Sequence, residues 1–236
     1  MLDPEKKEKY QNQLNKIIYR LKSEGYIVTL KSWVYIVPTD DDLKLNSVDL
    51  LEKYFYKLLK KYIIQEVGSD YYIWGIKALG FHLKDYSLPE KISIINSKVQ
   101  KKIKIWNFEI HFKILYWRKN GKKVLLFSQL EKYTKEKNIF DIRFKVAGLE
   151  LALLESCIIS DIHEWLDTSV TTKAIKKYSQ VLDLQILQQI GKIKYNMAFN
   201  RLKELSKHIS KDIYQTCLDV IKQNGWCFVW EWLRNI

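Results

Sequence analysis

The stretch KIKIWNFEIHFKILYW, residues 102–117, decides the fold class of this chain. Polar and apolar side chains alternate along it, and a period of two residues is typical of a β-strand. KISIIN at 91–96 and KKVLLFS at 122–128 alternate or run apolar in the same way. The middle of the chain is therefore predicted to form a β-sheet with one buried face. Lys101, Lys102 and Lys104 alternate with isoleucines, so the other face is predicted to be strongly positive.

Helical patterns lie on both sides of this sheet. Apolar residues follow helical spacing at 47–66, and a shorter helix is expected at 72–79, ending near Gly80. From Gly148 onward, segments such as LELALLESCII, LQILQQIGKI and IYQTCLDVIKQ repeat apolar residues about every 3.6 positions. Hydrophobic residues make up 47% of the chain, which argues against disorder. The order of elements predicts an α+β fold with a central mixed β-sheet and a C-terminal helical bundle.

The first part of the chain combines a basic helix with a β-hairpin. Residues 5–23 place apolar side chains at helical spacing with lysines between them, and Gly25 suits the helix end. GYIVTLKSWVYIVP, residues 25–38, predicts two short strands joined by a tight turn. A basic helix followed by a hairpin forms the second half of a winged helix, whose helix enters the major groove while the hairpin tip reaches phosphates. The same pattern also fits a plain αββ unit packed for stability.

A full winged helix has two further helices before the recognition helix, and Met1 leaves no room for them. We therefore expect an abbreviated winged-helix-like unit, unless later helices complete it or DNA binding has been lost. The candidate DNA contacts are the basic side chains of the helix and the polar tip of the hairpin, namely Lys6, Lys9, Lys16, Arg20, Lys22, Lys31 and Ser32.

Basic residues also concentrate in the predicted sheet. The chain carries a net charge of +13, and residues 91–123 hold ten basic residues against Glu109 alone, a net charge of +9. Such a surplus favours nucleic acid or an acidic partner. The candidate basic surface consists of Lys98, Lys101, Lys102, Lys104, Lys113, Arg118, Lys119, Lys122 and Lys123. Lysines also protect sheet edges against aggregation, and charge alone does not distinguish DNA, RNA and protein as partners.

Motifs of the common enzyme classes are missing from the sequence. It contains no HExxH, Walker A or GxGxxG motif, and its three cysteines form no CxxC pair. Asp161, His163 and Glu164 form an acidic cluster, but a helix would point the histidine away from the two acids. We therefore predict a protein that is not an enzyme, with no catalytic residue, metal or cofactor. Without an apolar signal core or a long apolar run, it is expected to be cytoplasmic, with no membrane partner.

Three segments, by their order and spacing, resemble the AbiEi-type antitoxins of bacterial type IV toxin–antitoxin systems. GYIVTLKSWVYIVP is similar to the wing of that family. DYYIWGIKALGFHL followed by LPEKISIIN is similar to its alanine–leucine, glycine–leucine helix and the strand after it. FKVAGLELALLES resembles the point where a strand enters the family's E-R-A-L-L-E/D helix, with Leu151 where arginine is usual. The resemblance spans roughly residues 10–160.

The resemblance implies a transcriptional autoregulator whose N-terminal winged helix binds operator DNA, and whose C-terminal region counteracts a nucleotidyltransferase-like toxin. We expect a winged-helix-like unit at 1–42, an α/β middle region with the basic sheet at 43–147, and a helical region at 148–236. The expected partners are double-stranded operator DNA and the cognate toxin, engaged directly or indirectly. The alternative is a non-enzymatic interaction module that holds an acidic protein or RNA on its basic sheet.

Overall fold

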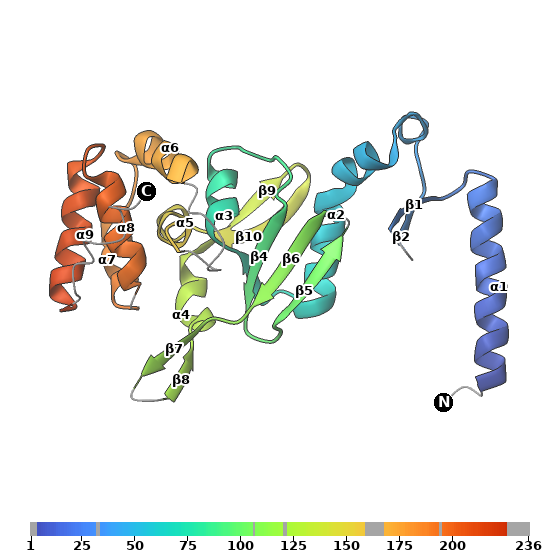
Figure 1. Ribbon diagram of the computed structural model, residues 1–236, viewed down its shortest axis with the longest axis horizontal. Helices are drawn as coiled ribbons and strands as arrows, with labels where there is room; N and C mark the ends of the chain where they lie inside the picture. The colour runs from blue at the N-terminus through green and yellow to red at the C-terminus, as the bar shows by residue number, and fades with distance from the viewer. Residues whose placement is uncertain are drawn as a thin grey trace. The chain divides into compact units, whose positions relative to one another are not determined.

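The computed structural model describes residues 4–31, 34–105, 107–119, 122–158, 168–193 and 195–225 (Figure 1). These residues form both helices and strands, and the predicted α+β class is confirmed. The chain divides into two compact units, residues 1–58 and 59–236, with the boundary inside helix α2 (Ser47–Val67). The first unit holds the N-terminal helix and hairpin. The second holds a six-stranded sheet and the C-terminal helices.

The N-terminal unit contains the predicted helix and hairpin. Its elements before α2 are α1 (Pro4–Ser23), β1 (Val28–Lys31), β2 (Val34–Ile36) and the 3₁₀ turn η1 (Asp42–Lys44). α1 ends because Gly25 takes a left-handed φ of 77°, which lets the Tyr26 N–H donate to the Leu21 carbonyl at 2.9 Å. β1 and β2 pair antiparallel, with Val28 opposite Ile36. The described residues before η1 form an αββ arrangement, and a winged helix is not confirmed.

The second unit is built on a mixed sheet with the strand order β5-β6-β4-β3-β10-β9. Its strands are β3 (Tyr71–Ile73), β4 (Lys91–Asn96), β5 (Lys101–Ile105), β6 (Phe108–Lys113), β9 (Thr134–Ile139) and β10 (Ile142–Ala147). β4 runs parallel to β6, and β3 runs parallel to β10, whereas the other neighbours are antiparallel. β5 therefore lies at an edge of the sheet, and the lysine-rich segment 101–105 is an edge strand.

Helices cover the two faces of this sheet (Figure 1). On one face, Lys60 of α2 donates from Nζ to the Tyr71 hydroxyl at 2.8 Å and lies 5.5 Å from the centre of the Phe144 ring. On the other face lie α3 (Gly75–His82) and α5 (Leu149–Ser156), and the Tyr72 hydroxyl donates to Glu155 of α5 at 2.8 Å. Neighbouring residues of β3 thus anchor opposite layers, as the alternation of side chains along a strand requires.

The prediction of a helix at 72–79 is wrong for its first residues. Tyr71–Ile73 forms the interior strand β3, and α3 begins only at Gly75. All three residues of β3 are buried, so this aromatic and β-branched run shows no alternation. Periodicity does not distinguish such a run from a buried helical segment. The sequence pattern also gives no sign of β9, whose side chains are mostly polar or charged.

The prediction that KKVLLFS belongs to the basic sheet is also wrong. β7 (Tyr116–Lys119) and β8 (Lys122–Leu125) pair with each other in a separate two-stranded sheet. The short α4 (Phe127–Leu130) and η2 (Glu131–Tyr133) follow it. Lys122 and Lys123 of β8 are exposed, so this strand offers few apolar side chains to bury in the main sheet. The candidate basic surface is therefore divided between two sheets.

The C-terminal part of the second unit is helical over the described residues, as predicted. After α5 come α6 (Thr168–Tyr178), α7 (Leu184–Gly191), α8 (Asn196–Ser206) and α9 (Lys211–Gln223). The Asp183 side chain caps α7 and the Ser210 hydroxyl caps α9, because each accepts from backbone N–H groups of the first turn. The hydroxyls of Ser156 and Thr171 lie 2.9 Å apart and connect α5 to α6.

Gly148 joins β10 to α5 at a close backbone approach. Its N–H donates to the Tyr133 carbonyl at 2.8 Å, and a β-carbon on Gly148 would lie 2.5 Å from the same oxygen. Because a backbone oxygen cannot swing aside as a side chain can, we expect Gly148→Ala to lower the free energy of unfolding by about 2–3 kcal/mol. Urea denaturation measures this loss. Gly80→Ala, whose β-carbon meets nothing closer than 3.7 Å, is the control that should not destabilise the protein. Equal stability of the Gly148 variant and the wild type would contradict the prediction.

Candidate functional site

The candidate DNA contacts on α1 are exposed to solvent, namely Lys6, Lys9, Lys16, Arg20 and Lys22. Arg20 Nε donates to Glu24 at 2.8 Å, and such an exposed ion pair contributes little stability. Lys22 Nζ lies 5.6 Å from the centre of the Tyr35 ring, a contact that joins the helix to the hairpin. Lys31 ends β1, but its side chain and the whole of Ser32 lie outside the described residues.

Three of these cations form a row along α1. Lys9, Lys16 and Arg20 stand at positions i, i+7 and i+11, so they project within about 40° of one another over about 16 Å of helix. An α-helix fits the major groove of B-DNA, whose two edges are lined by phosphates. The cationic row therefore has the length and direction needed to follow a phosphate backbone.

A second row on α1 is apolar and also exposed. Tyr10, Leu14 and Ile17 are 60%, 47% and 56% exposed. A complete winged helix buries the apolar stripe of its recognition helix against the two helices that precede it. The described residues do not build that core over α1, which is why the winged-helix prediction is not confirmed here.

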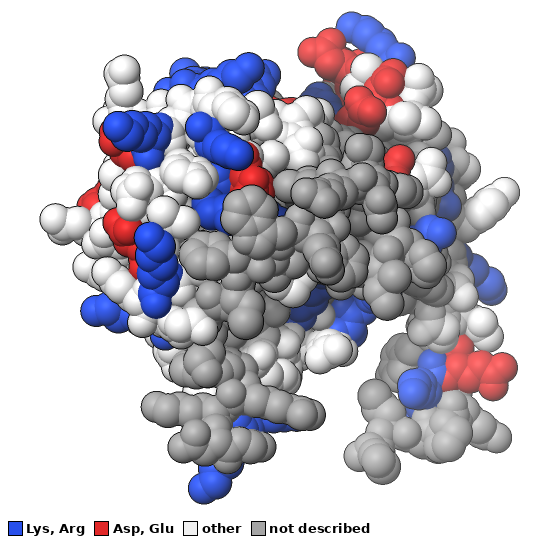
Figure 2. Space-filling model, turned by 60° about the vertical axis from the view of Figure 1, so that its left-hand side comes forward, with Lys and Arg blue, Asp and Glu red and all other residues white. Residues whose placement is uncertain are grey.

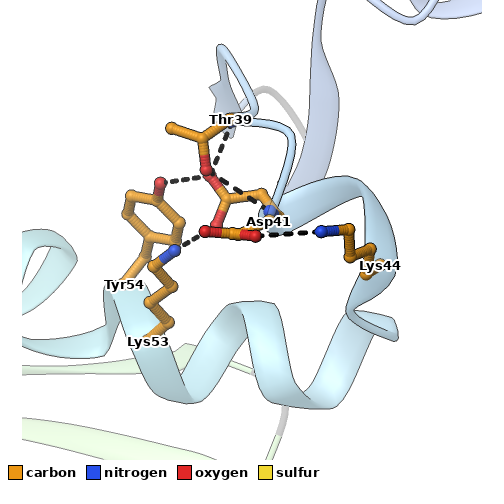
Figure 3. A network of polar contacts seen from close by, with 6 residues as sticks. Thr39, Asp41, Lys44, Lys53 and Tyr54 are labelled. Atoms are coloured by element: carbon orange, nitrogen blue, oxygen red, sulfur yellow. Dashed lines mark hydrogen bonds and ion pairs between the residues drawn. The ribbon is translucent and has the colours of Figure 1, made fainter.

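A network of polar contacts that includes Thr39, Lys53 and Tyr54 fixes the segment between the hairpin and α2 (Figure 3). Asp42 has no exposed surface and accepts hydrogen bonds from Lys53 Nζ at 2.6 Å, the Tyr54 hydroxyl at 2.7 Å and the Thr39 N–H at 2.8 Å. The hydrogen bond from Lys53, followed by those from Thr39 and Tyr54, holds the pKa of Asp42 well below its usual range. These hydrogen bonds together outweigh the opposing cost of desolvation. The network is structural and fixes the start of α2.

The candidate basic surface is partly neutralised. Lys101 Nζ lies 2.5 Å from Glu66, and Lys98 Nζ lies 2.9 Å from Asp70. Lys122 and Lys123 are exposed on β8, whereas the side chains of Arg118 and Lys119 lie outside the described part of the chain. On the face shown in Figure 2, basic side chains are dispersed among acidic and uncharged ones. The net charge of +9 in residues 91–123 therefore does not form one continuous positive surface. Lys102, Lys104 and Lys113 are the other basic residues of this set in the main sheet.

Lys102 and Lys113 line a cleft beside the β5 edge of the sheet. Lys102 lies directly opposite His111 in the β5–β6 register, and Lys113 follows two residues later on the same face. The cleft has a volume of about 610 Å³, within the range of small-molecule sites. Its lining is completed by two polar side chains, another lysine and five apolar or aromatic residues, namely Gln100, His111, Lys101, Trp74, Phe112, Ile114, Leu115 and Ile158. No carboxylate is among the described residues that line it.

His111 and Glu109 form a hydrogen-bonded pair at this cleft. His111 Nε2 lies 2.7 Å from the Glu109 carboxylate. Burial lowers the pKa of His111, Glu109 raises it, and nearby lysines including Lys102 lower it again, so the imidazole is neutral near pH 7. A neutral imidazole that bonds a carboxylate through Nε2 carries its proton on that nitrogen, which leaves Nδ1 as an acceptor. Nδ1 is buried and has no hydrogen-bond partner among the described residues.

Trp74 stands at the same cleft, directly after β3. Its Nε1 is buried and has no acceptor within hydrogen-bond distance among the described residues. The Trp74 side chain nevertheless interacts as a donor with Glu155 and favours the charged form of that carboxyl, so its N–H is directed at the buried carboxyl. Lys113 Nζ lies 5.2 Å from the centre of the Trp74 ring, which places the ammonium group beside the indole. Trp74 therefore contributes its ring to the wall of the cleft.

Glu155 lies in the core between the sheet and the C-terminal helices. It is 1% exposed and accepts hydrogen bonds from the Tyr72 hydroxyl at 2.8 Å and from the Gly75 N–H at 3.1 Å. Burial raises the pKa of Glu155 to about 8, although both hydrogen bonds favour the charged form. The Tyr195 hydroxyl is near enough to interact electrostatically with it. Glu155 therefore joins β3, α3 and α5 at one buried point.

The sequence prediction did not identify this cleft. His111 is one of four scattered histidines, and Trp74 lies far from it in the chain. One signal is present: Glu109, His111 and Lys113 alternate along one strand and so share a face. Among the described residues no group of His, Cys, Asp or Glu could hold a metal ion, and no helix is long and apolar enough to cross a membrane. Asp161, His163 and Glu164 lie outside the described residues.

No protein-family model matches the chain, and no curated protein is significantly similar to it.

Proposed function

We propose that this chain is a cytoplasmic, DNA-binding antitoxin and transcriptional autoregulator that counteracts a nucleotidyltransferase-like toxin. The observation that carries the DNA-binding part is the exposed cationic row of α1, formed by Lys9, Lys16 and Arg20. Phosphate contacts from such a row position a protein on duplex DNA and supply most of its non-specific affinity. The antitoxin part rests on the three AbiEi-like segments of the sequence.

The hairpin supports this proposal because it adjoins the basic helix. Tyr35 of β2 contacts Lys22 of α1, so the two elements form one local unit. In a winged helix the hairpin tip reaches flanking phosphates, and Lys31 and Ser32 occupy the corresponding position in this sequence. The exposed apolar row of Tyr10, Leu14 and Ile17 lies about a quarter turn from the cations, so phosphate contacts would not use it.

A second candidate function is supported by the sheet edge. Lys102 and Lys104 are exposed on β5 and share one face of this edge strand. They could hold an acidic protein or RNA without any role in DNA binding, which is the interaction module named as the alternative. Lysines on an edge strand also deter sheet-to-sheet association, so their position is not specific to a partner.

Two assays separate these functions. A labelled duplex from the region upstream of the reading frame should bind the full chain more tightly than an unrelated duplex of equal length. In cells, the triple variant Lys101→Glu/Lys102→Glu/Lys104→Glu should neutralise the cognate toxin less well and still bind the duplex. Loss of duplex binding in the sheet variant alone would show that the two surfaces have been assigned the wrong way round.

A further inference from the structure

The cleft beside β5 and β6 combines three kinds of chemistry. One wall is cationic, with Lys102 and Lys113 on the same face of neighbouring strands. One buried nitrogen of the lining, His111 Nδ1, has no hydrogen-bond partner among the described residues. The remaining wall is apolar and half-buried, formed by Ile114, Leu115 and Ile158.

We propose that this cleft binds a phosphate monoester attached to an apolar or planar group, such as a nucleoside monophosphate. The lysine ammonium groups are donors, and phosphate oxygens are acceptors. A phosphate monoester titrates near neutral pH, so it can donate a proton to His111 Nδ1 or hydrogen-bond to it as the monoanion. The Glu109 carboxylate on the opposite nitrogen would stabilise the resulting imidazolium.

The apolar wall distinguishes this ligand class from inorganic phosphate. Burying part of a ring or aliphatic group against Ile114, Leu115 and Ile158 adds affinity that a free phosphate ion cannot gain. A simple carboxylate would satisfy fewer donors than a phosphate, which has three terminal oxygens. The free nucleotide and the phosphorylated end of a nucleic acid strand share this chemistry, and binding assays distinguish them.

This inference is independent of DNA binding by α1. All the cleft residues belong to the second unit, whereas the cationic row belongs to the first. A chain that fails to bind duplex DNA but binds the nucleotide would disprove the proposed function and leave the cleft proposal standing.

Isothermal titration of the full-length chain tests the proposal, with adenosine monophosphate and phenyl phosphate as probes at low salt. We expect dissociation constants on the order of 10 µM to 1 mM. Adenosine and inorganic phosphate, each carrying half of the ligand chemistry, should bind at least about 10-fold more weakly. A short single strand with a 5′-phosphate should compete with the nucleotide if strand ends are accepted, and the same strand without the phosphate should not.

Variants locate the site. Lys102→Glu should weaken nucleotide binding at least about 10-fold, because a cation in contact with the phosphate becomes an anion. Lys135→Glu makes the same charge change at the opposite edge of the sheet, on the exposed surface of β9, and should change affinity less than about 2-fold.

Three results would overturn the proposal. The first is no binding of either phosphate ester up to about 10 mM, which is weaker than any site of this kind. The second is equal loss of affinity in the Lys102 and Lys135 variants, because that would show a general charge effect. The third is binding of inorganic phosphate as tight as that of the nucleotide, because the apolar wall would then contribute nothing.

Discussion

The double variant Lys16→Glu/Arg20→Glu is expected to bind duplex DNA at least about 100-fold more weakly than the wild type, since two cations facing phosphates become anions. Both side chains are exposed, and Arg20 gives up only a surface ion pair with Glu24, so the fold should persist. Fluorescence anisotropy with a labelled operator duplex measures the affinity, and circular dichroism checks that α1 stays helical.

A matched control exists on α6. Lys173 and Lys177 are exposed and stand four residues apart, as Lys16 and Arg20 do. Lys173→Glu/Lys177→Glu therefore changes the net charge by the same amount at the same spacing. It should weaken DNA binding by no more than the few-fold effect expected of net charge alone. Equal weakening by both double variants would contradict a specific DNA-binding role for α1.

Replacing Glu155 by glutamine is expected to remove a large pH dependence of stability. The pKa of Glu155 is about 8 in the folded protein, above its ordinary value of 4.5, so the folded state holds this proton more tightly than the unfolded state. Its contribution to stability is full below about pH 4.5 and is lost as the pH rises through 8. The loss over this window is on the order of 4 kcal/mol, a large part of the stability of a typical domain.

Urea denaturation of both proteins at pH 5 and pH 8.5 measures this contribution. The wild type should lose more stability than Glu155→Gln between the two values, because the amide does not ionise. Taking the difference between the two proteins cancels groups that titrate in both, such as Lys77, whose pKa burial lowers to about 8. Glu155→Ala should be less stable than Glu155→Gln at both pH values, because alanine leaves the Tyr72 hydroxyl and the Gly75 N–H without their acceptor. Parallel pH profiles for the wild type and Glu155→Gln would contradict the raised pKa.

Local sequence patterns predicted the helices and strands that have one buried face and one exposed face. The alternation in 101–113 predicted β5 and β6, and the 3.6-residue spacing after Gly148 predicted the C-terminal helices. The same reasoning failed for Tyr71–Ile73, because a strand buried on both faces has no polar side to reveal its period. The same reasoning wrongly assigned residues 122–128 to the main sheet, because the sequence of one segment does not show which strand it pairs with.

The cleft could be predicted only in part. The direct pairing of Lys102 with His111 follows from a β5–β6 hairpin with its turn near Asn107, and that much is local. Trp74 reaches the same cleft because β4 lies between β3 and β6, an order that the sequence pattern does not contain. Likewise, the sequence alone suggests that Glu155 is a surface carboxylate of an amphipathic helix. Only the packing of α5 on β3 shows that it is buried.

The salt dependence of duplex binding shows whether this chain binds DNA through phosphate contacts. If α1 and the hairpin neutralise about six phosphates, the logarithm of the association constant should fall with the logarithm of salt concentration at a slope near −5. Measuring the same slope for Lys16→Glu/Arg20→Glu should give a smaller magnitude, because fewer counterions are released. Anisotropy titrations of the full chain between about 50 and 200 mM salt cover the useful range. A slope near −5 for the wild type that flattens in the α1 variant is the predicted result. A flat response of the wild type, or no binding at the lowest salt, would contradict a DNA-binding function.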